Sequence, residues 1–146
     1  MGQIYATLEL INSWELESAR RGLVDQDEIK RMQVEMLVDT GSVNMCINET
    51  ICSLLQLPIV GKRKGTLADG TIVECAVAGP IEVHFKNRTC NISATVLPGD
   101  TECLLGAIPL EEMDIMIDPR RRELIVNPEH PEYAIYNLRS IFPYKE

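Results

Sequence analysis

Met36-Leu37-Val38-Asp39-Thr40-Gly41-Ser42 is the most informative segment in this chain of 146 residues. Its apolar residues run directly into an aspartate, a threonine and a glycine. A carboxylate at the end of an apolar strand costs free energy unless the protein uses it or satisfies it with hydrogen bonds. Taken alone, the segment fits two interpretations: a catalytic aspartate, or a turn in which Asp39 accepts hydrogen bonds from its own backbone.

A second motif, Glu102-Cys103-Leu104-Leu105-Gly106, also ends an apolar run on a glycine. With both motifs present, the chain from residue 32 to residue 118 resembles the retropepsin-like, single-lobe aspartic proteases of clan AA. That family pairs an apolar-apolar-Asp-Thr-Gly strand with a later apolar-apolar-Gly segment that packs beside it. The resemblance implies a mainly all-β fold, an acid-protease-type closed β-barrel or sandwich with one or two short helices, which forms an obligate homodimer.

The single Asp-Thr-Gly motif also predicts a stoichiometry. Aspartic proteases use two carboxylates that share one proton, because like charges about 3 Å apart cannot both ionise. The resemblance therefore implies that Asp39 meets its twin across a two-fold axis. It further implies that Thr40 bonds across the dimer and that the Gly41 amide stays close to the carboxylate. Asp39, Thr40 and Gly41 are thus the candidate catalytic residues, and no cofactor is implied.

Other acidic residues are weaker candidates for completing the pair within one chain. Asp69 belongs to an Asp-Gly sequence, which is typical of a hairpin turn. Asp114 and Asp118 flank an apolar segment but lack a following Thr-Gly, so we interpret them as solvated strand ends.

The segment Leu67-Ala68-Asp69-Gly70-Thr71 falls where the family places its flap, a lid over an extended peptide. Its single glycine and its acid predict a stiffer and more polar lid than the retroviral one, and Asp69 would repel acidic substrates. An ordinary surface hairpin is the alternative. The Ser42 hydroxyl, as a donor to the ionised carboxylate, predicts a lower first pKa of the dyad and a more acidic working range. The candidate peptide-binding residues are Ser42, Leu67, Ala68, Asp69, Gly70, Thr71, Leu105 and Gly106.

Hydrophobic periodicity and turn residues predict the remaining elements. Helices are expected after Asn12, with an irregular loop as the alternative, after Asn48, and at Pro109. Gly79-Pro80 is expected to break the chain. Strands are expected over residues 4–10, 32–38, 81–85, 89–96, 115–117 and 124–126.

We expect a protease domain over residues 1–127 and a C-terminal tail over residues 128–146. The tail is too apolar to float freely, so it packs either on its own domain or on the dimer partner. Its apolar residues are Tyr133, Ile135, Tyr136, Ile141, Phe142 and Tyr144.

Composition argues against nucleic-acid binding. Acidic residues number 22 against 14 basic ones, for a net charge of −8, and no basic cluster lies beside aromatic residues. The two basic runs, Lys62-Arg63-Lys64 and Arg120-Arg121-Arg122, are interpreted as solvated turns.

The chain is also expected to bind neither a membrane nor a metal. No apolar run reaches about 18 residues, and no signal peptide is visible. Five cysteines without C-x-x-C spacing predict buried free thiols in a reducing compartment, so a cytoplasmic protein is expected. His84 and His130 are isolated from other ligand residues, so no metal site is expected.

Two functions follow from the same motifs. The first is a homodimeric aspartic endopeptidase that hydrolyses peptide bonds with a water activated between two Asp39 carboxylates. The second is a non-catalytic dimer of the same fold that binds peptides or acts as a scaffold. In either case we expect an extended apolar peptide to lie against the flap and Leu104-Leu105-Gly106.

Overall fold

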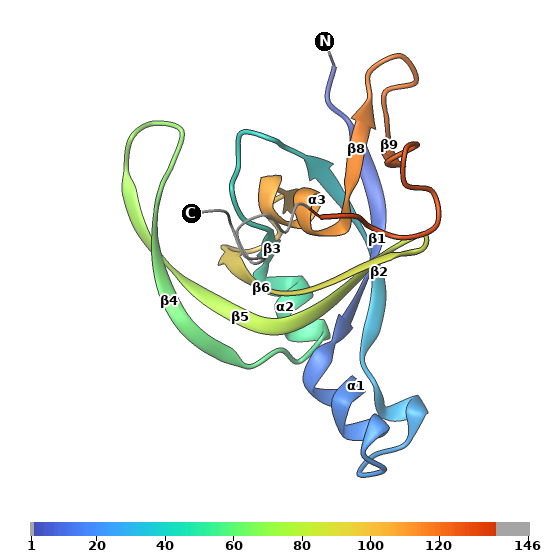
Figure 1. Ribbon diagram of the computed structural model, residues 1–146. Coiled ribbons are helices and arrows are strands. Elements are labelled where there is room, and N and C mark those ends of the chain that lie inside the picture. Colours follow the sequence, from blue (N-terminus) through green and yellow to red (C-terminus); the bar gives the residue numbers. More distant parts are fainter. Residues whose placement is uncertain (1, 137–146) are drawn as a thin grey trace, which may run out of the picture.

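A closed ring of strands organises the computed structural model, which describes residues 2–136 (Figure 1). In this part of the chain the large sheet has the order β1-β2-β7-β3-β6-β5-β4, and β1 also pairs with β5. That extra pairing closes the sheet into a barrel, so the predicted mainly β barrel with short helices is confirmed. The elements are β1 (Tyr5–Asn12), α1 (Ser13–Arg20), the 3-10 helix η1 (Gln26–Glu28), β2 (Arg31–Val38), β3 (Cys46–Asn48), α2 (Glu49–Leu54), β4 (Ile59–Thr66), β5 (Ile72–Phe85), β6 (Arg88–Leu97), β7 (Leu104–Leu105), α3 (Ala107–Met113), β8 (Ile115–Asp118) and β9 (Glu123–Val126).

The alternating strands β1 and β2 behave as their periodicity predicts. They pair antiparallel, with Leu8 opposite Val34 and Leu10 opposite Met32. Successive side chains of a strand point to opposite faces, so Leu8 and Leu10 share one face. This face is turned to the core, where both leucines are fully buried. Removing this apolar surface from water is the main stabilising contribution to the barrel.

A parallel pairing brings the two motifs of the sequence together. On β2, Leu37 and Val38 lie opposite Leu104 and Leu105 of β7. The amide of Leu37 donates to the carbonyl oxygen of Cys103 at 2.9 Å. The strand that carries Asp39 is therefore fixed directly beside the second apolar-apolar-glycine segment.

The helices begin where the capping residues predict. Asn12 accepts a hydrogen bond from the amide of Glu15 at 3.1 Å, and Asn48 accepts one from the amide of Ile51 at 2.8 Å. Each bond satisfies an amide that the first helical turn leaves without a partner. After Asn12 a helix forms, as one of the two alternatives predicted, and Pro109 lies in the first turn of α3.

Two local predictions are wrong. Lys62-Arg63-Lys64 lies inside strand β4, because its backbone pairs with residues 74–76 of β5 rather than forming a turn. Gly79-Pro80 does not end a strand either. Strand β5 continues through it, with a register shift between Ala78 and Ile81, so one half of β5 pairs with β4 and the other with β1. Tertiary pairing overrides local composition at both places.

The segment after β9 is attached to the domain by several hydrogen bonds, and a group of them meets at the Asp114 carboxylate. Asp114 accepts a hydrogen bond from Asn127 Nδ2 at 3.0 Å and one from the amide of Ile135 at 3.1 Å, and its Oδ2 lies 2.6 Å from His130 Nδ1. The residues Ile141, Phe142 and Tyr144, predicted as part of an apolar tail, lie outside the described residues. Within residues 2–136 no helix has the length and apolar character needed to cross a membrane.

Candidate active site

Asp39 occupies the first position after β2, in a tight turn. Its amide donates to the carbonyl oxygen of Leu105 at 3.0 Å, and its own carbonyl oxygen accepts from the amide of Ser42 at 3.0 Å. The Gly41 amide donates to Asp39 Oδ1 at 3.0 Å, which fixes the direction of the carboxylate. Thr40 is exposed in the middle of this turn.

The loop after Asp39 is joined to the start of α3. The amide of Ala107 donates to the carbonyl oxygen of Ser42 at 2.8 Å. The amide of Ile108 donates to the carbonyl oxygen of Val43 at 2.9 Å. Gly106, buried between these segments, leaves no room for a side chain. The backbone around Gly106 therefore holds the loop that follows the carboxylate.

A cleft of about 780 Å³ runs from Asp39 to the hairpin of β4 and β5. In Figure 1 the tip of this hairpin stands opposite the loop that follows β2. A cleft of this size is in the range that accommodates small ligands or several peptide side chains. Asp39 is its only carboxylate among the residues that the structure describes.

The predicted peptide-binding residues divide into three groups. Ser42, Leu67 and Ala68 line the cleft. The hairpin tip, Asp69-Gly70-Thr71, is exposed and lies outside the lining, and Asp69 accepts a hydrogen bond from the Thr71 amide at 2.9 Å. That hydrogen bond lowers the pKa of Asp69 and ties its carboxylate to the turn, away from the cleft.

The third group, Leu105 and Gly106, is buried behind the wall of the cleft. Leu104 lines the cleft instead. Neighbouring residues of a strand face opposite sides, so only one leucine of the pair could reach the cleft, and the sequence alone did not indicate which.

Ser42 does not serve the carboxylate as the sequence suggested. Its hydroxyl donates to the carbonyl oxygen of Asn44 at 3.2 Å, within its own loop. The hydrogen bond that reaches Asp39 comes instead from the backbone amide of Gly41. The predicted acidic working range therefore loses its structural basis in this protomer.

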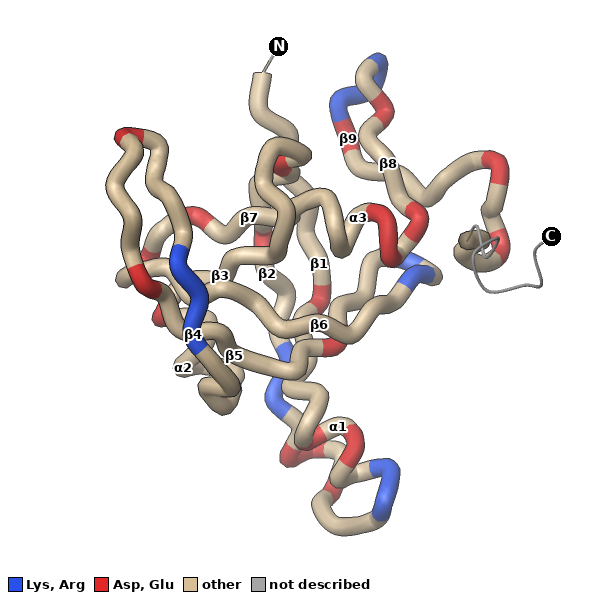
Figure 2. Tube along the Cα trace, turned by 60° about the vertical axis from the view of Figure 1, so that its left-hand side comes forward, with Lys and Arg blue, Asp and Glu red and all other residues tan. Residues whose placement is uncertain are grey.

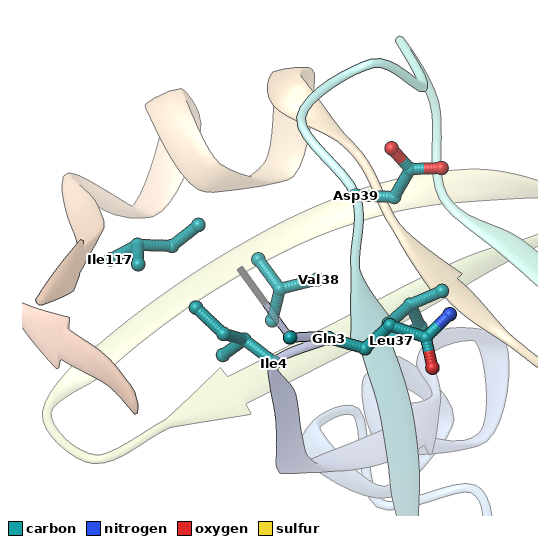
Figure 3. A pocket seen from close by; sticks show the side chains of 7 residues that line it. Gln3, Ile4, Leu37, Val38, Asp39 and Ile117 are labelled. Atoms are coloured by element: carbon teal, nitrogen blue, oxygen red, sulfur yellow. The ribbon is translucent and has the colours of Figure 1, made fainter. Parts of the chain in front are cut away.

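A second hollow, of about 390 Å³, lies on the other side of Asp39. It is mainly apolar, and Figure 3 shows the Asp39 carboxylate directed away from Ile4 and Ile117. The remaining acids considered as partners lie elsewhere. Asp114 binds the segment after β9, and Asp118 accepts from the amides of Arg120 and Arg121 in the β8–β9 turn.

Several residues that line the cleft were not predicted from the sequence. Arg63 and Cys75 lie opposite each other on β4 and β5, and Cys46 comes from β3. Extending the register outward from a two-residue Asp69-Gly70 turn would have paired Arg63 with Ala76. The turn is instead closed by Leu67 and Thr71, and this longer turn pairs Arg63 with Cys75. Burial raises the pKa of the Cys46 thiol.

Comparison with solved structures identifies the type of barrel. The chain matches the crystal structure of the retroviral protease-like domain of Ddi1 from Leishmania major with a TM-score of 0.53, over 88% of this chain and 90% of that one. The fold is retropepsin-like. Sequence identity is 15%, a level at which the likeness shows the fold alone. No protein-family model matches the sequence, and no curated protein does so.

Proposed function

We propose that this chain is a homodimeric aspartic endopeptidase of the retropepsin-like family, with one Asp39 carboxylate from each protomer. The observation that carries the proposal is the position of Asp39, a partly exposed carboxylate at the edge of the cleft, fixed by the Gly41 amide and by the β2–β7 pairing. We assign its partner to a second copy, since Asp39 is the only carboxylate of residues 2–136 that lines this cleft.

The proposed chemistry is hydrolysis by two carboxylates that share one proton. The ionised Asp39 removes a proton from a water molecule, and the water oxygen attacks the scissile carbonyl carbon. The protonated Asp39 of the other protomer donates its proton to the carbonyl oxygen. Collapse of the tetrahedral intermediate then breaks the C–N bond and transfers a proton to the leaving amine.

Exposed groups around the carboxylate support dimer formation. Thr40 is exposed at the turn, where its hydroxyl is available to a second protomer. Val43 is 60% exposed and Ile108 45% exposed, and the two residues are joined by a backbone hydrogen bond. An apolar surface beside an incomplete site is suited to association with a second copy.

We further propose an extended peptide as substrate and the cytoplasm as location. A strand-like peptide fits between the Asp39 loop and the inner face of the β4–β5 hairpin, which acts as the flap. The tail beyond residue 127 supplies additional contacts to its own domain or to the partner. The free thiols of all five cysteines suit a reducing compartment, and the net charge of −8 does not favour nucleic acid.

The test compares the wild type with Asp39→Asn on a diverse peptide library between pH 3 and pH 7. We expect the wild type to cleave and Asp39→Asn to lose activity by at least about a thousandfold, while remaining folded. Asp27→Asn is the matched control, because Asp27 is exposed on η1 and makes the same charge change outside the cleft. Identical product patterns from wild type and Asp39→Asn, or none from either, would favour the non-catalytic peptide-binding dimer.

Assembly provides an independent test of the shared site. We expect sedimentation to give a dimer at micromolar concentration. Adding excess Asp39→Asn protein to the wild type should inhibit cleavage, because mixed dimers contain one carboxylate. A monomer that still cleaves peptides would contradict the two-chain site.

A further inference from the structure

Arg63 places a positive charge on the inner face of the hairpin that covers the cleft. Every other residue of β4 is exposed, whereas Arg63 is partly buried. Its guanidinium reaches past β5 to β6, where Nη1 donates to Thr95 Oγ1 at 2.6 Å. Both Arg63 and Thr95 line the cleft that contains Asp39. Lys64 also borders this cleft, but it is exposed, so Arg63 is the partly buried cation of the lining.

The neighbouring Lys62 belongs to the outer face of the same hairpin. Its side chain is 74% exposed, and its ammonium group lies 3.9 Å from the carboxylate of Glu74. Figure 2 shows the basic residues midway along β4 and the acidic hairpin tip beyond them. Successive side chains of a strand alternate between its faces, so Arg63 points inward while Lys62 points outward.

The cleft leaves the Arg63 charge without a carboxylate. Arg63 forms no ion pair with any carboxylate of residues 2–136, and Thr95 is a neutral acceptor for one of its five donors. Asp39 is the only acid of the described residues in this cleft, and the proposed chemistry uses it. A guanidinium in such a position is suited to bind a carboxylate through two parallel hydrogen bonds.

We infer that Arg63 selects substrates with a glutamate or aspartate side chain at one position close to the scissile bond. This inference rests on the proposed function, because it assigns the specificity of the same cleft. It replaces the expectation that Asp69 repels acidic substrates, since Asp69 lies outside the cleft lining and binds its own turn. The preferred substrate is an extended peptide that combines apolar residues with one acidic residue.

The test uses pairs of peptides that differ only by Glu or Gln at each position around the cleaved bond, with both termini blocked so that only the side chain supplies a carboxylate. At one position we expect the wild type to prefer Glu by roughly tenfold or more in kcat/KM. Arg63→Gln should remove this preference, and Arg63→Glu should favour Lys there. Lys62→Gln, on the outer face, and Lys64→Gln, an exposed cation that borders the cleft, are the matched controls, and both should keep the preference.

These outcomes separate specificity from stability and from catalysis. If Arg63 only supported the hairpin, Arg63→Gln would slow cleavage of Glu and Gln peptides equally, which would overturn the inference. Cleavage by the wild type without any Glu preference would overturn it while leaving the protease proposal intact. If the wild type cleaves nothing, the test becomes a binding measurement. The affinities of Asp39→Asn and of the double variant Asp39→Asn/Arg63→Gln for the same Glu and Gln peptides are then compared. Equal affinities of the two proteins, or no binding by either, would overturn the inference.

Discussion

A Cβ atom placed on Gly106 would lie 2.3 Å from the carbonyl oxygen of Asn44. It would also lie 2.6 Å from the carbonyl oxygen of Ser42, so backbone atoms enclose it on more than one side. The glycine of the second motif therefore allows the loop after Asp39 to pack against the start of α3. No residue with a side chain could keep the two segments in this contact.

Gly106→Ala should destabilise the protein by about 1–3 kcal/mol, because the contacts are with backbone atoms that cannot rotate away. Urea unfolding measures this difference in the free energy of unfolding. Gly61→Ala is the matched control, since a Cβ there meets nothing within 4 Å, and its effect should stay within about 0.5 kcal/mol. Equal effects of the two variants would show that the close packing at Gly106 contributes nothing to stability.

Ser42→Ala should leave the acid limb of the pH–rate profile in place. The Ser42 hydroxyl donates to the Asn44 carbonyl oxygen and not to the carboxylate, so its removal takes no donor from Asp39. The sequence alone predicts the opposite, an upward shift of the acid limb. Steady-state cleavage of one peptide from pH 3 to pH 7 distinguishes the two. An upward shift would mean that Ser42 turns toward the dyad in the assembled enzyme.

Because Asp114 holds the segment after β9, this attachment should weaken as the pH falls and the carboxylate becomes protonated. The Asn127 side chain, followed by His130 and the Ile135 amide, lowers the pKa of Asp114 from 3.8 to about 2. A carboxylate with a lowered pKa in the folded state stabilises the protein fully above about pH 4, and this contribution disappears as the pH falls toward 2. We therefore expect the stability difference between wild type and Asp114→Asn to shrink between pH 5 and pH 2.

Urea unfolding at several pH values measures this difference, and hydrogen exchange at the Ile135 amide reports the local attachment. A stability difference that stays constant down to pH 2 would contradict the assigned role of Asp114.

The cysteines that line the cleft should react faster with thiol reagents than the cysteines buried in the core. Cys46 and Cys75 line the cleft and are partly exposed, whereas Cys52, Cys90 and Cys103 are buried. Burial also raises the pKa of Cys90 to about 12, so little thiolate forms there. Ellman's reagent at pH 8 should modify Cys75 in the native protein and also Cys46, more slowly because burial raises the pKa of its thiol. After unfolding it should modify all five thiols.

A peptide bound in the cleft should protect Cys46 and Cys75 from the reagent. Mass spectrometry of the labelled protein identifies the modified residues. Fast labelling of Cys90 or Cys103 in the native protein would contradict the described core.

Much of the barrel could be predicted from the sequence because its elements depend on local physics. Leu8, Leu10, Val34 and Met36 alternate with polar residues, and this pattern buries one face of each strand. The caps of α1 and α2 could likewise be predicted, since a capping side chain acts within three residues of its own position. The partnership between β2 and β7 came from the resemblance of two motifs and not from periodicity.

The cleft was predicted less completely because its lining depends on strand register. Arg63 appeared to be part of a solvated turn until its pairing with Cys75 placed it on the inner face of the hairpin. Leu104 and Leu105 are equally apolar, and only their pairing with β2 determines which one faces the cleft. A shift of one residue would exchange these faces.

The sequence by itself determined that a carboxylate ends an apolar strand and that a glycine follows the apolar run of each motif. It also determined that each chain contributes one Asp-Thr-Gly. Such features are short-range, so they can be recognised without coordinates. Only the tertiary structure decided that the Ser42 hydroxyl donates to Asn44 and not to Asp39, and that Arg63 is the partly buried cation that lines the cleft. A hydroxyl can turn toward several acceptors, so its partner is set by the folded geometry of the loop. The position of Arg63 depends on cross-strand pairing, which local sequence does not encode.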